Sequence, residues 1–325
     1  MESIYLSDIE NINISSLDVF DKREYLKQLK DYIIEYRTNL SLPSNVLYGV
    51  EIEYKGVDKS NLDEIIYEYP SFSSVEERNI EVGGELVSIP LKDDYKNWYD
   101  MKEILDILNS FEGIEKDTGT GSHVHVSANT LGTYDNFLKF LLLYSIYEGV
   151  IYRFGYMNRC NPRETMISCA VPSSIELSQD YHDFLEGLSC REIRKKYDRF
   201  HGINLTNLKS LDKYKEKNTI EFRMANGTFD PVLWQNIINF YTKFLLATHK
   251  DLDVERLEYL MYRYNINRMN YQGFDKYDLD LAIEFADIVF DNILDKTNFL
   301  KQYIKDGTET QNEFNVHMCK KFTRS

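Results

Sequence analysis

The sequence predicts an α+β fold, with strands of antiparallel type in the first two thirds of the chain and helices between and after them. Two observations lead to this prediction. Several short segments alternate apolar and titratable residues, as strands with one buried face do. Other segments, including almost all of the chain after Pro231, repeat apolar residues at steps of three and four, as amphipathic helices do.

The predicted strands are short. The first alternates apolar and charged residues in its second half, Pro90 stops the second, and a glycine-rich turn leads into the third. Together the five predicted strands cover residues 46–55, 84–89, 122–127, 201–208 and 219–226.

The predicted helices show helical periodicity, and the clearest carry their apolar residues in a single stripe, such as Trp98, Met101 and Leu105 in the third of them. They cover residues 21–39, 61–69, 93–112, 133–153, 180–187, 189–198, 231–249, 252–264, 276–292 and 295–304. Residues 155–178 break this pattern with two prolines and several polar residues, so we expect a long functional loop or an irregular pair of strands there.

The composition is that of a folded globular protein. Of 325 residues, 43% are apolar and 14% are aromatic, so the chain can bury a large core and is not disordered over most of its length. With 53 acidic and 38 basic residues, the formal net charge is −15, which disfavours general binding to nucleic acid. ATP is not excluded, because divalent cations can accompany a nucleotide into an acidic site.

The sequence also predicts a cytoplasmic protein without a membrane partner. Its four cysteines are scattered and form no C-x-x-C pair, which favours reduced thiols. The N-terminus lacks the basic and apolar regions of a signal peptide. The most apolar stretch, 137–157, is interrupted by Lys139, Glu148 and Arg153, so we expect a buried helix rather than a membrane span. The abundance of Asn, Ile, Lys and Tyr is compatible with a bacterial or phage origin.

Three of the predicted strands place titratable residues on one face and apolar residues on the other. The pairs that share a face are Glu51 with Glu53, His123 with His125, and Glu221 with Arg223. Taken alone, the glutamate pair is also typical of a solvated sheet face, the histidine pair of a buried histidine, and the Glu–Arg pair of a surface ion pair. Together they suggest a metal site, because so many carboxylates side by side need cations to neutralise them. One sheet face carrying Glu51, Glu53, Glu85, His123 and Glu221 could hold two divalent cations.

These residues fall within five ordered motifs, at 48–53 (YGVEIE), 84–90 (GELVSIP), 119–127 (GTGSHVHVS), 201–205 (HGINL) and 219–223 (TIEFR). In these motifs the chain resembles the glutamine synthetase superfamily of carboxylate–amine ligases, and within it most the amidoligase enzymes. The resemblance covers about residues 46–230. It implies a core at 46–250, a helical lead-in at 1–45 and a helical C-terminal extension at 251–325 packed on the core.

The resemblance implies a curved antiparallel half-barrel sheet, as in the catalytic domain of glutamine synthetase, with the site on its concave face. It implies ATP and two or more Mg²⁺ or Mn²⁺ ions as cofactors. Matched position by position, Glu53 and Glu85 would hold one metal ion, and Glu51, His123 and Glu221 would hold the other.

The resemblance also implies roles for the residues around the metal ions. Arg223 would lie against the transferring phosphoryl group, and Glu51 and Arg159 would join it in catalysis. Contacts with the cofactor would come from Arg223, His125 and Ser127.

Two positions stay open at this point. Among the arginines before the last strand, Arg159 is preferred because it lies in a polar loop, but Arg153, Arg163 and Arg199 are also available. The remaining ligand of the first metal ion is not identified, and Glu81 is one candidate.

The implied reaction is an ATP-dependent ligation that forms an amide or peptide bond. Phosphorylation converts an unreactive carboxylate into an acyl phosphate, which an amine then attacks. The expected substrates are small-molecule or peptide carboxylates and amines, and the helical C-terminal part could build a homo-oligomer. The alternatives are a Zn²⁺- or Mn²⁺-dependent hydrolase using the His-x-His and Glu cluster, a phosphotransferase on the same fold, and a non-catalytic relative.

Overall fold

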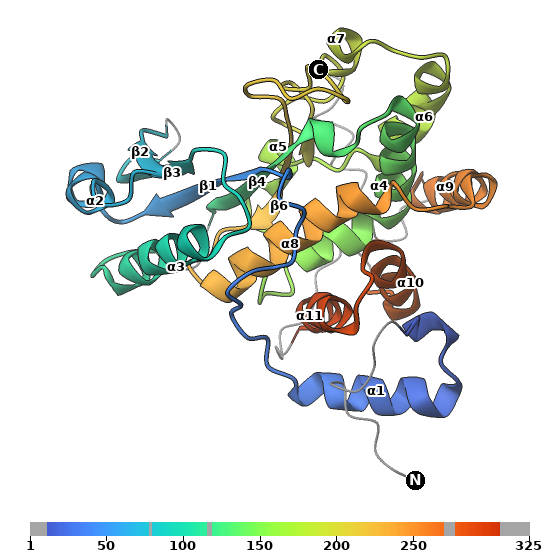
Figure 1. Cartoon of the computed structure of the whole chain (residues 1–325), viewed down its shortest axis with the longest axis horizontal. Helices are drawn as coiled ribbons and strands as arrows, with labels where there is room; N and C mark the ends of the chain where they lie inside the picture. Colours follow the sequence, from blue (N-terminus) through green and yellow to red (C-terminus); the bar gives the residue numbers. More distant parts are fainter. Residues whose placement is uncertain (1–11, 78–79, 116–118, 270–276, 306–325) are drawn as a thin grey trace.

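The computed structural model describes residues 12–77, 80–115, 119–269 and 277–305. Within these ranges the chain forms a six-stranded open sheet and a set of helices, which confirms the predicted α+β class (Figure 1). The strands follow the order β2-β3-β1-β4-β6-β5, and neighbouring strands are antiparallel throughout. Their bounds are β1 (Tyr48–Lys55), β2 (Phe72–Val75), β3 (Gly83–Ser88), β4 (Gly121–Ser127), β5 (Ile203–Asn204) and β6 (Thr219–Asn226).

The helices surround the sheet and make up most of the rest of the described chain. Their bounds are α1 (Val19–Asp31), α2 (Lys59–Ile66), α3 (Tyr95–Ser110), α4 (Tyr134–Gly155), α5 (Met166–Cys169), α6 (Ser174–Leu185), α7 (Cys190–Ile193), α8 (Pro231–Ala247), α9 (Val254–Met269), α10 (Leu279–Val289) and α11 (Ile293–Ile304). None of the helices in the described ranges combines the length and the apolar character needed to cross a bilayer.

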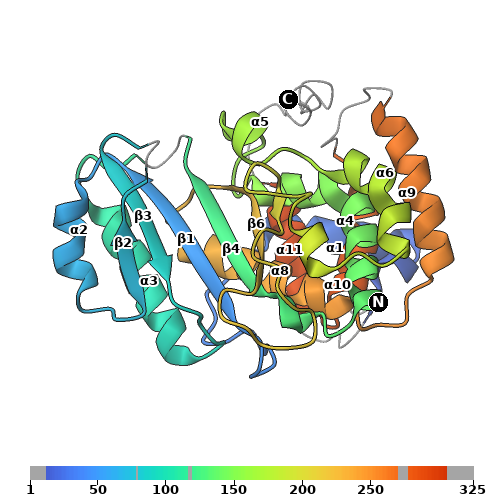
Figure 2. The same ribbon diagram turned by 90° about the horizontal axis from the view of Figure 1, so that it is seen from above.

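The apolar face of the sheet meets the core helices, of which α3 and α8 lie behind the strands in Figure 2. In β1, burial alternates residue by residue, so that Val50 and Ile52 face the core while Glu51 and Glu53 lie on the other face. In β6, Phe222 stacks on Tyr241 of α8, with the ring centroids 4.3 Å apart. The alternation predicted from the sequence therefore leaves the polar face of the sheet available for a functional site.

The first helix is shorter than predicted. It ends at Asp31 rather than at residue 39, because the backbone at Tyr32 is extended. Tyr36, beyond this point, still contacts α3, since its hydroxyl donates a hydrogen bond to the carbonyl oxygen of Trp98 at 2.6 Å, whereas Ile33 is exposed. The helical spacing of these residues therefore does not correspond to a continuous buried face.

The region predicted as a long loop at 155–178 is only partly a loop. It contains α5, and α6 begins at Ser174 rather than near residue 180. The buried carboxylate of Glu148 in α4 accepts hydrogen bonds from the backbone N–H groups of Ser173 and Ser174, at 2.5 and 2.9 Å. A distant residue therefore caps this helix, although the sequence carries the local S-x-x-E capping-box pattern at Ser173 and Glu176, whose N-cap side chain makes no capping hydrogen bond.

Three further differences concern short elements. The strand β2 was not predicted, because its residues, FSSV, do not alternate apolar and polar types. The strand predicted at 201–208 shrinks to β5, since the side chain of Asn204 accepts a hydrogen bond from the backbone N–H of Thr206 at 3.0 Å and turns the chain away. The helix predicted at 189–198 shrinks to the single turn of α7.

Candidate active site

The strand β1 lies at the centre of the polar face, between β3 and β4. The antiparallel register places Glu51 opposite His123 of β4, and Glu53 opposite Glu85 of β3. On the far side of β4, His125 lies opposite Glu221 of β6. The register thus brings together residues that lie far apart in the sequence, with at least one carboxylate or imidazole on each of four neighbouring strands.

Glu51 connects the two histidines. Its Oε2 lies 3.0 Å from Nδ1 of His123, and its Oε1 lies 2.8 Å from Nε2 of His125. Burial alone would raise the pKa of Glu51, but the hydrogen bonds and charges of both rings outweigh it and hold the pKa well below its usual value. Glu51 is therefore an ionised carboxylate shared by both halves of the site.

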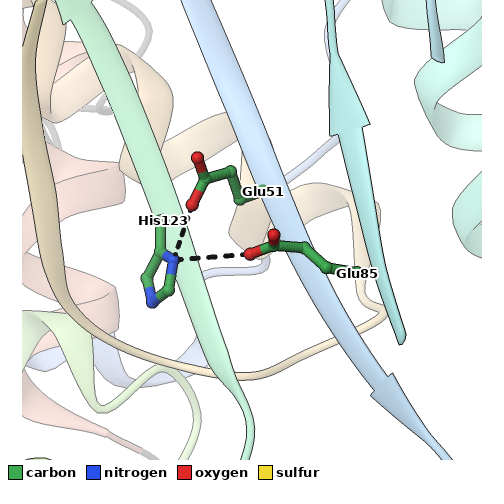
Figure 3. Close-up of side chains that lie close together, drawn as sticks. All are labelled: Glu51, Glu85 and His123. Carbon is green, nitrogen blue, oxygen red and sulfur yellow. Dashed lines mark hydrogen bonds and ion pairs between the residues drawn. The ribbon is translucent and has the colours of Figure 1, made fainter. Parts of the chain in front are cut away.

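Four carboxylates surround the imidazole of His123. Its Nδ1 lies 3.0 Å from Glu51, 3.8 Å from Glu85 and 3.9 Å from Glu221, and its Nε2 lies 3.6 Å from Glu53. Figure 3 shows Glu51 and Glu85 converging on this ring from two neighbouring strands. The structure therefore brings together all five residues that the sequence predicts as metal ligands.

Two groups of three have the spacing that a metal ion requires. They are Glu51 with Glu85 and His123, and Glu51 with His125 and Glu221, and each offers ligand atoms within 4.8 Å of one another. His123 is almost fully buried, yet its Nε2 has no hydrogen-bond partner within the described residues. Carboxylate oxygens with one imidazole are the donors of a Mg²⁺ or Mn²⁺ site, so these residues fit the predicted cations.

The position two residues before His123 requires glycine for steric reasons. A Cβ atom at Gly121 would come within 2.8 Å of Nε2 of His123 and within 3.3 Å of the guanidinium of Arg163. The backbone N–H of Gly121 also donates a hydrogen bond to Oε2 of Glu53 at 2.6 Å. The G-x-G-x-H-x-H motif therefore lets the backbone come close to the acidic cluster.

Arg223 lies at the edge of the cluster. Its NH1 donates a hydrogen bond to Glu221, and its Nε donates one to the carbonyl oxygen of Cys169 at 3.4 Å. The other oxygen of Glu221 accepts a hydrogen bond from the side chain of Asn204 at 2.7 Å. Asn204 is thus a supporting residue that sequence reasoning did not single out, although it lies in one of the motifs.

Two cavities open on the polar face and share Glu51. The smaller, of about 240 Å³, contains most of the acidic cluster together with Arg223. The larger, of about 610 Å³, lies toward the start of β1 and contains the predicted cofactor residues His125 and Ser127. The Nδ1 of His125 lies 3.1 Å from the hydroxyl oxygen of Thr219, which fixes the ring on the floor of this cavity.

The arginines that line the smaller cavity are not the one preferred from the sequence. Arg163 and Arg199 line the smaller cavity, whereas Arg159 is not among the described residues that line it. Arg163 is buried, and its guanidinium donates to the carbonyl oxygens of Ala225 and Arg223 rather than to a carboxylate. Burial lowers the pKa of Arg163 from its usual value.

The structure offers a different candidate for the remaining ligand of the first metal ion. Glu77 lines the smaller cavity, and its charge contributes to the raised pKa of Glu85. Glu81, the candidate named from the sequence, is not among the described residues that line this cavity. Glu77 was missed because its segment carries three glutamates, Glu76, Glu77 and Glu81, and only the fold distinguishes among them.

We expect the metal-free protein to lose stability as the pH rises across the neutral range. The pKa of Glu85 is raised to about 9, because the side chain is buried and lies near the charges of Glu51 and Glu53. Between the ordinary carboxyl value and this raised value, only the folded state keeps the proton. The free energy of unfolding should therefore fall with increasing pH, by up to about 1.4 kcal/mol per pH unit. Urea denaturation in EDTA at a series of pH values measures this slope.

The Glu85→Gln variant is the control for this slope, because glutamine keeps the shape without the proton. Burial opposes a rise in the pKa of His125, but its hydrogen bond with Glu51 and the charge of Glu221 raise it overall. The stability that His125 contributes is likewise lost as the pH rises, and it persists in the variant. Equal slopes in the wild type and the variant would show that Glu85 does not hold a proton in the folded protein.

A comparison with protein families identifies the family of this chain. Residues 71–245 match the family described as "putative amidoligase enzyme", and this segment is more than half of the chain. The match includes Glu85, both histidines, Glu221 and Arg223, whereas Glu51 and Glu53 precede it. The chain matches no curated protein. It belongs to the amidoligase family, whose name denotes a ligase.

Proposed function

We propose that this protein is an ATP- and Mg²⁺-dependent carboxylate–amine ligase that forms an amide bond through an acyl phosphate. The observation that supports this most directly is the ring of four carboxylates around His123, with Arg223 at its edge. Such a cluster suits several cations and a polyphosphate, and membership of the amidoligase family supplies the reaction class.

The residues assigned to the cations are those that the structure brings together. Glu51, His123 and Glu221 would hold one ion, and Glu53 with Glu85 would hold a second, with Glu77 as a further ligand. When bound, these ions neutralise phosphate charge and act as Lewis acids. Glu51 is also the residue that the two compact groups of ligand atoms described above have in common.

The chain's own cations bind and orient the substrate anions. Arg223 would contact the transferring phosphoryl group from the edge of the cluster, since it lines the smaller cavity. We assign the second anion-binding role to Arg163 or Arg199 rather than to Arg159, because these two line that cavity. Arg163 is the stronger candidate, since its guanidinium binds backbone carbonyls and keeps its positive charge without a carboxylate partner among the bonds described.

The nucleotide is assigned to the larger cavity. A volume of about 610 Å³ suits a nucleotide, whereas about 240 Å³ suits a carboxyl-bearing side chain or the end of a peptide. His125 and Ser127 lie in the larger cavity, as the predicted cofactor contacts should. Because both cavities include Glu51, a phosphoryl group could pass between them at the acidic cluster.

The fold assigned with this function is a glutamine synthetase-like half-barrel. The antiparallel order β2-β3-β1-β4-β6-β5 and an open polar face support it. All the residues given a role here lie between β1 and β6, which supports the proposed core at 46–250.

A Zn²⁺ hydrolase is the less favoured alternative. Each of the two compact groups contains one imidazole and two carboxylates, whereas catalytic Zn²⁺ sites commonly use more nitrogen or sulfur ligands. A phosphotransferase would use the same residues and would differ only in its product.

A thermal-shift titration tests the proposal. We expect Mg²⁺ together with a non-hydrolysable ATP analogue to raise the melting temperature of the wild type, because a ligand bound only to the folded state stabilises it. The Glu221→Ala variant should lose this shift. Glu64→Ala, at an exposed position of α2, should keep it. If the nucleotide has no effect while Zn²⁺ alone stabilises strongly, the ligase proposal fails and the hydrolase takes its place.

A further inference from the structure

One segment of this acidic chain is strongly basic. Residues 191–217, which we call the basic segment, contain nine basic and four acidic residues, a net charge of +5 in a chain of −15. The segment runs from α7 to the residues before β6. In Figure 1, α7 lies on the opposite side of the sheet from α8 and α11, which is the side that carries the polar face.

The two ends of the basic segment lie near each other and beside the cavities. The charges of Lys215 and Arg194 both act on the thiol of Cys190, so the loop before β6 lies close to α7. Lys215 and Lys217 line the larger cavity, and Arg199 lines the smaller one. The basic segment therefore borders the openings of the candidate active site.

Most of these cations lack a carboxylate partner. Lys196 is neutralised by Asp180 and Asp183, at 3.1 and 3.0 Å. Within the described part of the chain, no ion pair closer than 4 Å is formed by the others, which are Arg191, Arg194, Lys195, Arg199, Lys209, Lys213, Lys215 and Lys217. All of these except Arg194 are exposed. The surface thus offers a row of cations for an anionic partner.

Hydrogen bonds order the base of the loop before β6 that carries these lysines. The side chain of Asn218 is buried and accepts hydrogen bonds from the backbone N–H groups of Lys209 and Ser210, at 2.7 and 3.1 Å. It also donates to the carbonyl oxygen of Ser210 at 2.8 Å. This network fixes the base of the loop, so Lys215 and Lys217 project from an ordered turn.

We propose that the carboxylate substrate of this enzyme is an acidic peptide or polypeptide segment. Its neighbouring carboxylates would lie along the basic segment, while the carboxyl group to be activated would enter the smaller cavity beside Arg199 and Arg163. This inference rests on the proposed ligase function. The small cavity takes only a side chain or a chain end, whereas the basic segment extends well beyond it, so an extended acidic substrate would reach cations that a small one would not.

An acidic peptide fits this surface better than a nucleic acid does. The rest of the chain carries a net charge of −20, which repels both kinds of polyanion, so the distinction comes from the chemistry of the reacting group. The reaction class acts on carboxyl groups, which an acidic peptide contains in number and a nucleic acid lacks. A local cationic surface next to the site would overcome the repulsion of an acidic substrate by the remainder of the protein.

The test measures binding of a fluorescent oligoglutamate to the full-length protein by anisotropy, with Mg²⁺ present. We expect binding that weakens steeply with salt. The variant K213S/K215S/K217S should bind at least about tenfold more weakly, as the loss of three charge contacts implies. The matched control is K27S/K30S/K92S, which removes the same charge at exposed positions away from both cavities and should change affinity by less than about twofold.

The outcomes separate this inference from the proposed function. If oligoglutamate fails to bind, or if both triple variants weaken it equally, the inference is wrong even where the Mg²⁺–nucleotide shift is intact. If a single-stranded oligonucleotide of equal charge binds more tightly than oligoglutamate at the same surface, a nucleic-acid partner replaces the acidic peptide. If the peptide binds through the basic segment but the nucleotide shift is absent, the surface stands and the ligase proposal fails.

Discussion

Replacing Glu51 by Gln is expected to reduce the affinity for Mn²⁺ by more than about a hundredfold, because even residues that only support metal ligands cost tenfold to a hundredfold. Glu51 belongs to both groups of candidate ligands, so one substitution removes a charge from each. Both of its oxygens are also used, one near His123 and one near His125. Glutamine keeps the size of the side chain but offers one oxygen and no charge, and it cannot accept hydrogen bonds from both rings.

Calorimetric titration with Mn²⁺ measures this effect directly, and the shift produced by Mg²⁺ with the ATP analogue provides a second readout. Glu53→Gln is the matched comparison, since Glu53 lies in the same cluster but in neither of the two compact groups. It should lose less affinity than the Glu51 variant. In EDTA at neutral pH, Glu51→Gln should be less stable than the wild type, because the two histidines hold the pKa of Glu51 below its usual value and its ionised form therefore stabilises the folded protein. An unchanged Mn²⁺ affinity would remove Glu51 from the centre of the site.

The residues of the site could be predicted because strand alternation is a local property. Once Glu51 and Glu53, or His123 and His125, are separated by one apolar residue, they must share a face. Their partners on neighbouring strands could not be derived in this way. That Glu51 lies opposite His123, and Glu53 opposite Glu85, depends on the order of the strands in the sheet, which tertiary packing decides.

The second anion-binding arginine was also hard to predict, because tertiary packing decides which arginine lines the cavity. Arg159 and Arg163 lie four residues apart in one polar stretch, and nothing in their local sequence separates them. The fold does, because Asn226 at the end of β6 accepts a hydrogen bond from the backbone N–H of Arg163 at 2.8 Å and holds that residue against the sheet. The start of α6 is a comparable case, since the cap comes from Glu148 in another helix.

Replacing Asp295 by Ala is expected to lower the free energy of unfolding by about 3–5 kcal/mol, the usual cost of removing one partner from a buried ion pair. Asp295 is 1% exposed and lies between two cations, Arg37 at 2.8 Å and Lys243. It also accepts hydrogen bonds from the side chains of Asn239 and Asn292, at 2.8 and 2.6 Å. Without the carboxylate, two cations and two amides would be left facing one another with no acceptor.

The position of this cluster explains why its loss should affect the site as well as stability. Arg37 belongs to the segment that leads into β1, Lys243 lies on α8 behind the sheet, and Asp295 lies on α11. The carboxylate thus links the strand that carries Glu51 to helices that follow it by some 200 residues in the sequence. A loss of this link should therefore weaken nucleotide binding even though no residue of the site has changed.

Urea denaturation with a pH series distinguishes this role from a general effect of mutation. Burial alone would raise the pKa of Asp295, but the charges of Lys243 and Arg37 outweigh it and hold the pKa below its usual value. The stabilisation by Asp295 is therefore complete above its ordinary pKa of about 3.9, and it is lost as the pH falls through the lower pKa of the folded state. The difference in free energy of unfolding between the wild type and the variant should therefore become smaller in acid. Asp291→Ala removes an exposed partner of Lys250 and should cost about 1 kcal/mol or less. If both variants were equally stable at neutral pH, the buried cluster would contribute no more than a surface ion pair.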